Sequence, residues 1–165
     1  MYMGLTCKVG AYRRVLEEVL KLNIQKGNTF LLFGPIDILI QFTEVESLDQ
    51  FIERWFNTIR VIGAEEGLIS RSVTLVVIHE GPLFAEEPYA FTFMHVNPAK
   101  LEKVQRSLLD MPEVISADTV FGPYDVICAV RADNKEDLEN TISTIQRDIP
   151  DIEGVITSIT AGIRV

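Results

Sequence analysis

The sequence has few of the residues that bind metals or act as nucleophiles. Among its 165 residues are only two cysteines, Cys7 and Cys128, and two histidines, His79 and His95. Each cysteine lies in an apolar stretch with no second cysteine or histidine at metal-binding spacing, so we expect two small buried thiols. The histidines also stand alone, which favours satisfied or exposed side chains over metal ligands. We therefore predict no metal site and no cofactor.

Long apolar runs are missing as well. A membrane-spanning helix needs roughly 18 apolar residues in a row, and Gly34, Pro35 and Asp37 interrupt the longest candidate. The opening MYMGLTCKVG lacks the basic start and the continuous apolar core of a signal peptide. We therefore expect a cytoplasmic protein that makes no membrane contacts.

Clusters of basic residues are also missing. The net charge is -9, and residues 84–165 carry 7 Lys and Arg against 14 Asp and Glu. An acidic chain without a basic patch repels phosphate groups. Direct binding to nucleic acid or to an anionic membrane is therefore not expected.

What the sequence does contain is a phrase that occurs twice. FGPID stands at residues 33–37 and FGPYD at residues 121–125. A repeat at this distance predicts two similar domains of about 80 residues each. We expect a first repeat at 1–80, a linker at 81–88 and a second repeat at 89–165. Prolines, a glycine and glutamates in HEGPLFAEEPY mark the linker.

Hydrophobic periodicity predicts the order βαββαβ in the second half. An alternating strand, a helix that starts at a proline, a hairpin through Gly-Pro, a capped helix and a last strand follow one another. The segments are YAFTFMHV (89–96), the helix from Pro98, VISADTVF (114–121), DVICAVR (125–131), the helix capped by Asp133 with Glu136, and VITSITAGIRV (155–165).

The first half repeats this order with weaker boundaries. The expected segments are a strand at Leu5–Val9, a helix from Tyr12 to Leu20, NTFLLF and IDILIQF around Gly34-Pro35, a helix capped by Ser47 with Gln50, and a strand at 68–78. A βαββαβ unit of this size forms a four-stranded antiparallel sheet with both helices on one face, which is the ferredoxin-like plan. The predicted fold class is therefore α+β.

This plan leaves one face of each sheet without helices. Tyr89, Phe91 and Phe93 fall on one side of their strand, so the bare face is apolar. Covering a few hundred Å² of apolar surface at about 25 cal/mol per Å² contributes several kcal/mol. We therefore predict that the two repeats pack sheet to sheet as a covalent pseudo-dimer, similar to a dimeric α/β-barrel.

On these features, residues 89–165 resemble the effector-binding domain of the Lrp/AsnC family of leucine- and asparagine-responsive regulators, also called the RAM domain. The resemblance runs through AFTFMHVNPAKLEKV, MPEVISADTVFGPYDVICAVRAD and EGVITSITAGIRV. Residues 1–78 look like a more diverged copy, with Ile36 where the second copy has Tyr124. The resemblance implies domains paired sheet to sheet, amino acids bound near the Gly-x-x-Asp turns, and transcription as the output.

The sequence departs from the family pattern in two ways. Family regulators usually carry a helix-turn-helix domain before the effector domain, whereas only eight residues precede Val9-Gly10, where the first helix is expected to begin. The tandem duplication also places within one chain an interface that family members form between chains. We therefore expect a module without its own DNA-binding domain that acts through partners.

The two Gly-Pro turns are the candidate ligand site. Glycine lets backbone N–H groups come close to a ligand, carboxylates can accept from an ammonium, and hydroxyls can donate to a carboxylate. The predicted ligand-binding residues are Gly122, Tyr124, Asp125, Thr157, Ser158, Thr160, Gly34 and Asp37, with Ser70, Ser72 and Thr74 as first-copy counterparts of the hydroxyls. The alternative is structural, because Gly-Pro is common in hairpins and a nearby aspartate often binds turn amides.

Three functions stay open at this point. The first is a non-enzymatic module that senses an amino acid or a related small metabolite, forms a homo-oligomer or joins a full-length regulator, and modulates transcription. The second is a small enzyme of the dimeric α/β-barrel type, although the sequence offers no Ser-His-Asp set and no pair of metal-binding carboxylates. The third is a structural assembly partner with degenerate pockets. We expect the first, and therefore predict no catalytic residue.

Overall fold

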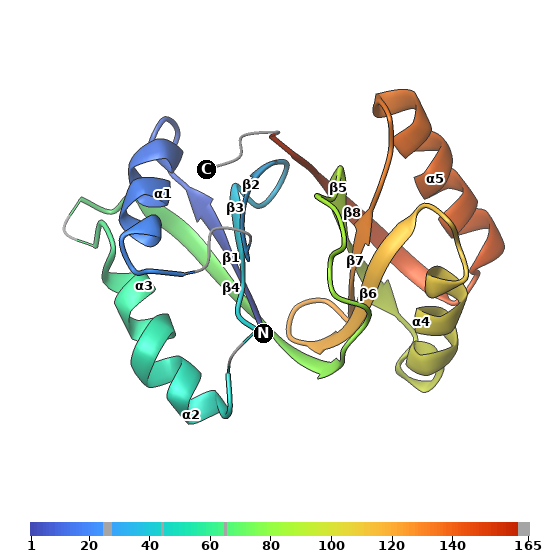
Figure 1. Ribbon diagram of the computed structural model, residues 1–165, viewed down its shortest axis with the longest axis horizontal. Coiled ribbons are helices and arrows are strands. Elements are labelled where there is room, and N and C mark those ends of the chain that lie inside the picture. The colour runs from blue at the N-terminus through green and yellow to red at the C-terminus, as the bar shows by residue number, and fades with distance from the viewer. Residues whose placement is uncertain (25–27, 44, 65, 162–165) are drawn as a thin grey trace. The chain divides into compact units, whose positions relative to one another are not determined.

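The computed structural model describes residues 1–24, 28–43, 45–64 and 66–161 (Figure 1). The chain divides into two compact units, of which the first contains Met1–Thr74 and the second begins at Leu75. This division falls within strand β4 (Ile69–His79), ahead of the linker expected at 81–88. The ends of the two predicted repeats stay a prediction.

The second unit has the order βαββαβ that the sequence predicts, in an α+β fold. Its elements are β5 (Ala90–Val96), the 3-10 turn η3 (Pro98–Lys100), α4 (Leu101–Leu109), β6 (Val114–Phe121), β7 (Val126–Val130), α5 (Lys135–Asp148) and β8 (Ile152–Thr160). The strand pairs are antiparallel, with β5 between β8 and β7, and with β6 beyond β7. The end of β4 continues this sheet, because Val76 lies opposite Phe121 of β6. This is the ferredoxin-like sheet order.

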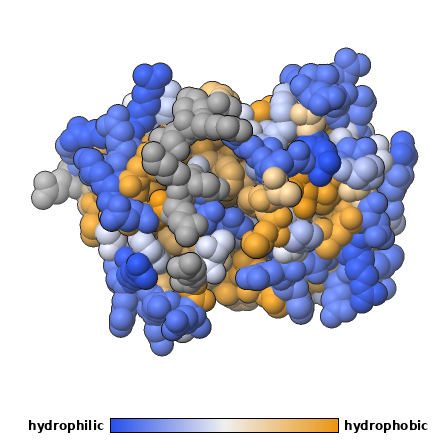
Figure 2. Space-filling view, viewed as in Figure 1, coloured by the Kyte–Doolittle hydropathy of each residue, from blue (hydrophilic) through white to orange (hydrophobic). Residues whose placement is uncertain are grey.

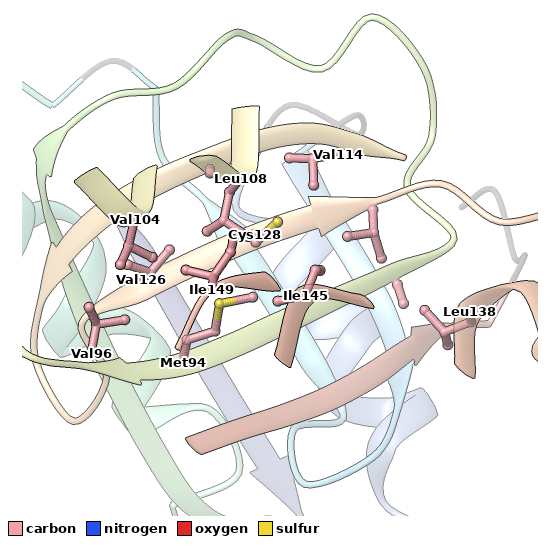
Figure 3. Packing of buried hydrophobic residues seen from close by; sticks show 13 residues of the cluster. Met94, Val96, Val104, Leu108, Val114, Val126, Cys128, Leu138, Ile145 and Ile149 are labelled. Carbon is pink, nitrogen blue, oxygen red and sulfur yellow. The ribbon is translucent and has the colours of Figure 1, made fainter. Parts of the chain in front are cut away.

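Helices α4 and α5 cover one face of this sheet (Figure 1). Figure 3 shows Leu108 of α4 and Ile145 of α5 among the side chains of Met94, Val126 and Cys128 from the strands. Full burial of an aliphatic side chain of this size contributes about 1.5–3 kcal/mol. The upper right region of Figure 2, where α5 lies, is mostly hydrophilic. One side of α5 is buried against the sheet and the other is polar, so the helix is amphipathic.

The first unit repeats the same order. Its elements are β1 (Tyr2–Cys7), α1 (Tyr12–Leu20), β2 (Thr29–Phe33), β3 (Ile38–Gln41), α2 (Leu48–Phe51), the π-helical turn η2 (Ile52–Phe56), α3 (Asn57–Val61) and the start of β4. Strand β3 lies between β1 and β2, and both pairs are antiparallel. The start of β4 lies beside β1, because the Ser70 hydroxyl donates to the Thr6 carbonyl at 2.9 Å and the Lys8 N–H donates to the Leu68 carbonyl at 2.8 Å. The sheet order is therefore ferredoxin-like here too.

The predicted helix caps were right in one unit and shifted in the other. The Ser47 hydroxyl accepts from the backbone N–H of Gln50 at 3.1 Å, as expected. Helix α5 is capped by Asn134 and not by Asp133, which was wrong by one residue. Asn134 has extended backbone angles, and its side chain accepts from the N–H of Asp137 at 3.0 Å. Both residue types cap well, so the backbone conformation decides which one does.

Two strands begin three residues before their predicted first residue. Strand β1 covers Tyr2–Cys7 and not Leu5–Val9, because its register with β3 begins at Tyr2 and Lys8 already belongs to a turn in which its carbonyl accepts from Ala11. Strand β8 covers Ile152–Thr160 and not 155–165, because its pairing with β5 begins at Ile152. Residues 162–165 of that prediction lie outside the described residues.

Two expectations of the sequence concern the whole chain. In the part of the chain that the structure describes, no helix has the length and apolar character that a membrane span needs. The packing of the two repeats sheet to sheet stays a prediction.

Candidate functional site

Asp125, the last residue of FGPYD, joins the β6–β7 hairpin to strand β5. Its backbone N–H donates to the Met94 carbonyl at 2.9 Å, and its own carbonyl accepts from the Val120 N–H at 2.8 Å. Its side-chain Oδ2 accepts from the Val96 N–H at 3.0 Å. The aspartate therefore fixes the turn to the end of β5 through two hydrogen bonds, and a third closes the hairpin itself.

Asp37, the last residue of FGPID, makes the same three contacts in the first unit. Its N–H donates to the Leu5 carbonyl at 2.9 Å, and its carbonyl accepts from the Leu32 N–H at 2.8 Å. Its Oδ2 accepts from the Cys7 N–H at 2.7 Å. The recurrence of the whole network supports the structural reading of both aspartates. In each aspartate, only the part of the carboxylate that faces solvent could then contact a ligand.

A small aromatic cluster surrounds the turn of the second unit. The Tyr124 ring lies with its centroid 5.3 Å from that of Phe93 and 5.3 Å from that of His95. The Nδ1 atom of His95 is 3.8 Å from Oδ2 of Asp125, and these two side chains are 50% and 34% exposed. An imidazole and a carboxylate at the protein surface can bind a small polar ligand with both donors and acceptors.

Sequence reasoning set His95 aside, although a signal for it was present. Because side chains alternate along a strand, His95 lies on the same face of β5 as Phe93. The first unit has buried Ile36 at the position of Tyr124 and therefore lacks the phenol.

The hydroxyls predicted on β8 do not converge. Thr157 lies opposite Thr92, and Ser158 lies opposite Phe91. Neighbouring residues of a strand point to opposite faces of the sheet, so Thr157 and Ser158 cannot contact one ligand on the same face. Ser158 is fully buried, and its hydroxyl has no hydrogen-bond partner among the described residues.

Thr160 lies at the other end of β5 from the turn. Its hydroxyl donates to the carbonyls of Pro88 and Tyr89, at 2.7 and 2.9 Å, where β5 begins. Asp125 lies beside Val96, where β5 ends. At about 3.3 Å per residue the two ends are roughly 20 Å apart. The structure therefore brings Tyr124 and Asp125 together with His95, and it does not bring Thr160 to them.

The remaining predicted residues have simple positions. Gly34 and Gly122 lie at exposed turns, and the Thr6 hydroxyl donates to the carbonyl of neighbouring Pro35 at 2.9 Å. Of the hydroxyls predicted for the first repeat, that of Ser70 donates its hydrogen bond to β1. These contacts hold the turn and the sheet of the first unit.

The second unit also contains a cavity of about 660 Å³ that the sequence did not indicate. The lining residues are Glu86, Glu87, Pro88, Tyr89, Glu113, Arg131, Ala132, Asp133, Asp137, Asn140, Thr141, Thr144 and Thr160. They come from the segment before β5, the residue before β6, the β7–α5 junction, one side of α5 and the end of β8. Thr160 is the predicted site residue that lines it. Such a set of separate segments leaves no local pattern in the sequence.

The two thiols differ in burial but share low reactivity. Cys128 is buried as predicted, whereas Cys7 at the end of β1 is only half-buried. Burial raises the pKa of Cys128 to about 12, and burial with the nearby Asp37 carboxylate raises the pKa of Cys7 to about 11. The thiolate is the nucleophile, so neither cysteine is activated. Among the residues that the structure describes, no group of three His, Cys, Asp or Glu side chains could hold a metal ion.

With the fold and the turn defined, comparison with known proteins identifies the second unit. Residues 89–162 match the family model of the Lrp/AsnC ligand binding domain. This part of the chain is an Lrp/AsnC ligand binding domain. The resemblance predicted from the sequence is therefore confirmed for the second half.

Three known proteins are similar to this chain in sequence or in fold. The HTH-type transcriptional regulator FL11 of Pyrococcus horikoshii is 33% identical over 70 residues, which are 42% of this chain and 46% of the regulator. The match thus spans less than half the length of that relative. A solved structure of the hypothetical protein PHS023 from Pyrococcus horikoshii is 36% identical over 45% of this chain and 88% of its own, with a TM-score of 0.41.

The siroheme decarboxylase NirDL, solved in complex with an iron-uroporphyrin III analogue, aligns over 97% of this chain and 70% of its own. The identity is 12% and the TM-score 0.56. At this identity the likeness concerns the fold alone.

Proposed function

We propose that this chain is a regulatory effector-binding module that senses an amino acid or a related small metabolite. It modulates transcription through protein partners, as a homo-oligomer or together with a full-length regulator. The observation that carries the proposal is the match of residues 89–162 to the Lrp/AsnC ligand binding domain. The similarity to a transcriptional regulator over 70 residues supports the same role.

The effector site in this proposal is the turn of the second unit. Asp125 accepts the ligand ammonium with the part of its carboxylate that faces solvent, and Tyr124 and His95 form the wall beside it. Backbone N–H groups near Gly122 contact the ligand carboxylate. The turn of the first unit, with Gly34 and Asp37, is a second and weaker site because Ile36 replaces the tyrosine.

The hydroxyls of β8 have a reduced part in this site. Ser158 stays in the proposed site, because its buried hydroxyl has no hydrogen-bond partner among the described residues and a ligand could supply one. Thr157 and Thr160 contribute to the sheet and to the start of β5 instead.

A thermal-shift scan against the common amino acids at millimolar concentration tests the proposal. A ligand at 100 times its dissociation constant adds about 2.7 kcal/mol to the free energy of unfolding, which is several degrees for a chain of this size. The shift should be selective and should be lost in Tyr124→Ala and in Asp125→Asn. Asp110→Asn, which removes a charge at the end of α4, is the matched control and should keep it. A scan without any shift contradicts the proposal and favours an assembly partner.

The His95–Asp125 pair favours one further candidate, a small enzyme of the same fold. A histidine held 3.8 Å from a carboxylate beside an aromatic ring can move a proton or contact a cofactor. Incubation with a tetrapyrrole tests this candidate. Absorbance of a bound tetrapyrrole that His95→Ala abolishes would favour the enzyme over the sensor, and an unchanged spectrum of the mixture would dismiss it.

A further inference from the structure

The cavity of the second unit lies apart from the turn proposed as the effector site. Its volume of about 660 Å³ falls within the range of small-molecule sites, about 300–1,000 Å³. It lies at the start of β5, where Thr160 binds Pro88 and Tyr89, and not at the end of β5, where Asp125 lies. A ligand in this cavity would be a second ligand of the same unit.

The charge around the cavity is strongly negative. Among the described residues, five carboxylates line it, from Glu86, Glu87, Glu113, Asp133 and Asp137, together with one basic side chain. That side chain is Arg131, which pairs with Glu86 at 2.8 Å. The arginine offsets the charge of Glu86, and Glu87 has an interaction of its own, so the carboxylates of Glu113, Asp133 and Asp137 make the lining acidic. A cleft lined by charge of one sign concentrates ligands of the opposite sign.

The carboxylates are spread around the cavity and do not meet at one point. A calcium or magnesium ion needs several oxygen ligands within about 2.0–2.6 Å of one centre. No cluster of three acidic, histidine or cysteine side chains suited to a metal exists among the residues that the structure describes. The complementary ligand is therefore one whose positive charges are separated along a chain.

The largely buried residue Thr141 points to a ligand independently of the charge. Thr141 is only 6% exposed, lines the cavity, and has no hydrogen-bond partner among the described residues. Buried polar groups normally have a partner, so a hydroxyl on the wall of a cavity marks a place for a ligand group. Asp137 lies four residues before Thr141 along α5 and Thr144 three residues after it, which puts both on the same side of the helix as Thr141.

We propose that this cavity binds a short aliphatic polyamine with two or three ammonium groups. The ammonium groups of the polyamine contact Asp133, Asp137 and Glu113. One of its ammonium groups also donates a hydrogen bond to the Thr141 hydroxyl. The methylene segments lie against Tyr89 and Ala132. This inference does not depend on the proposed function, because the turn is tested with amino acids and with variants of Tyr124 and Asp125.

Isothermal titration of spermidine into the full chain at low ionic strength tests the proposal. Each carboxylate that contacts an ammonium contributes a charge-assisted hydrogen bond, so Asp133→Asn and Glu113→Gln should each weaken binding about fivefold to tenfold. Thr141→Val has nearly the same shape without the hydroxyl and should weaken binding about threefold to tenfold. The matched control is Glu136→Gln, which removes the same charge from the first turn of α5 but does not line the cavity.

Melting curves of each variant, without ligand, establish that it is folded. Diacetylated spermidine, which has lost two of its three charges, should bind at least tenfold more weakly than spermidine. Absence of spermidine binding at millimolar concentration overturns the proposal. Equal weakening by Glu136→Gln and Asp133→Asn overturns it too, since the attraction would then come from the general charge of the surface. Binding that Thr141→Val leaves unchanged removes the hydroxyl from the site and contradicts the proposed pose.

Discussion

The side-chain Oδ2 of Asp125 accepts a hydrogen bond from the backbone N–H of Val96 at 3.0 Å. This bond joins the turn of one hairpin to the last residue of a strand that lies 29 positions earlier in the chain. The same bond joins Asp37 to Cys7 at 2.7 Å. The repeated phrase therefore encodes a joint between the central hairpin and the first strand of each unit.

Loss of this joint should destabilise the chain. Asp125→Ala leaves the Val96 N–H without its acceptor, and we expect the free energy of unfolding to fall by about 1–3 kcal/mol. Asp125→Asn keeps a side-chain oxygen and should cost less than the alanine variant. Urea unfolding of both variants measures the difference. If alanine and asparagine both leave stability unchanged, the joint has no structural role.

The close fit of Gly81 gives a second stability prediction. A Cβ atom at this position would lie 2.6 Å from the carbonyl oxygen of Ala117 and 2.8 Å from Oγ of Ser116. Backbone atoms cannot move aside cheaply, so Gly81→Ala should lower the free energy of unfolding by about 1–3 kcal/mol. Gly154→Ala is the control, because its Cβ would come no closer than 3.6 Å to His95. Similar melting temperatures of the two variants would contradict this prediction.

The buried thiol of Cys128 predicts a loss of stability at alkaline pH. Burial raises the pKa of Cys128 in the folded chain to about 12, from an ordinary value of 9.0. Well below pH 9 the thiol is protonated in both states, so its contribution to stability is complete there. Between about pH 9 and 12 the unfolded chain releases the proton and the folded chain keeps it, so stability falls as pH rises.

Urea unfolding at about pH 8 and about pH 10 measures this effect. In Cys128→Ala, the part of the alkaline loss that comes from the thiol should disappear, and the remaining loss comes from other groups. An equal loss in the parent chain and in the variant would contradict the assignment to Cys128.

The exposure of Phe121 separates it from the core aromatics. Phe121, the first residue of FGPYD, is 74% exposed, whereas Phe93 is fully buried. We expect Phe121→Ser to change the free energy of unfolding by less than about 0.5 kcal/mol and Phe93→Ala to reduce it by about 3–5 kcal/mol. Calorimetric melting of the two variants tests this contrast. A large loss in the Phe121 variant would mean that a partner covers this turn in solution.

Most of the fold could be predicted from the sequence because local signals agreed with one another. The alternation in β5, the two Gly-Pro hairpins and the Ser47 cap each favour the same βαββαβ order. The sequence could not choose between Asp133 and Asn134 as the cap, since two adjacent residues of equal capping ability differ only in backbone angles. The start of β1 was equally open, because its register with β3 depends on residues 33 to 39 positions away.

The candidate site was predicted less well than the fold. The three hydroxyls of β8 were grouped by their closeness in sequence, although the alternation of a strand already separates Thr157 from Ser158. His95 was judged by its lack of a second metal ligand, which says nothing about a neighbouring carboxylate. The cavity around Thr141 needed the fold, because its walls come from segments more than 70 residues apart.

The joint made by Asp37 and Asp125 has a consequence for detecting distant copies of this unit. The aspartate binds a backbone N–H, and every residue except proline has one. The residue that is held therefore varies freely, as Cys7 in one unit and Val96 in the other illustrate. A comparison of side chains at the end of the first strand will miss this joint, while the spacing between the held residue and the aspartate, 30 in one unit and 29 in the other, retains it.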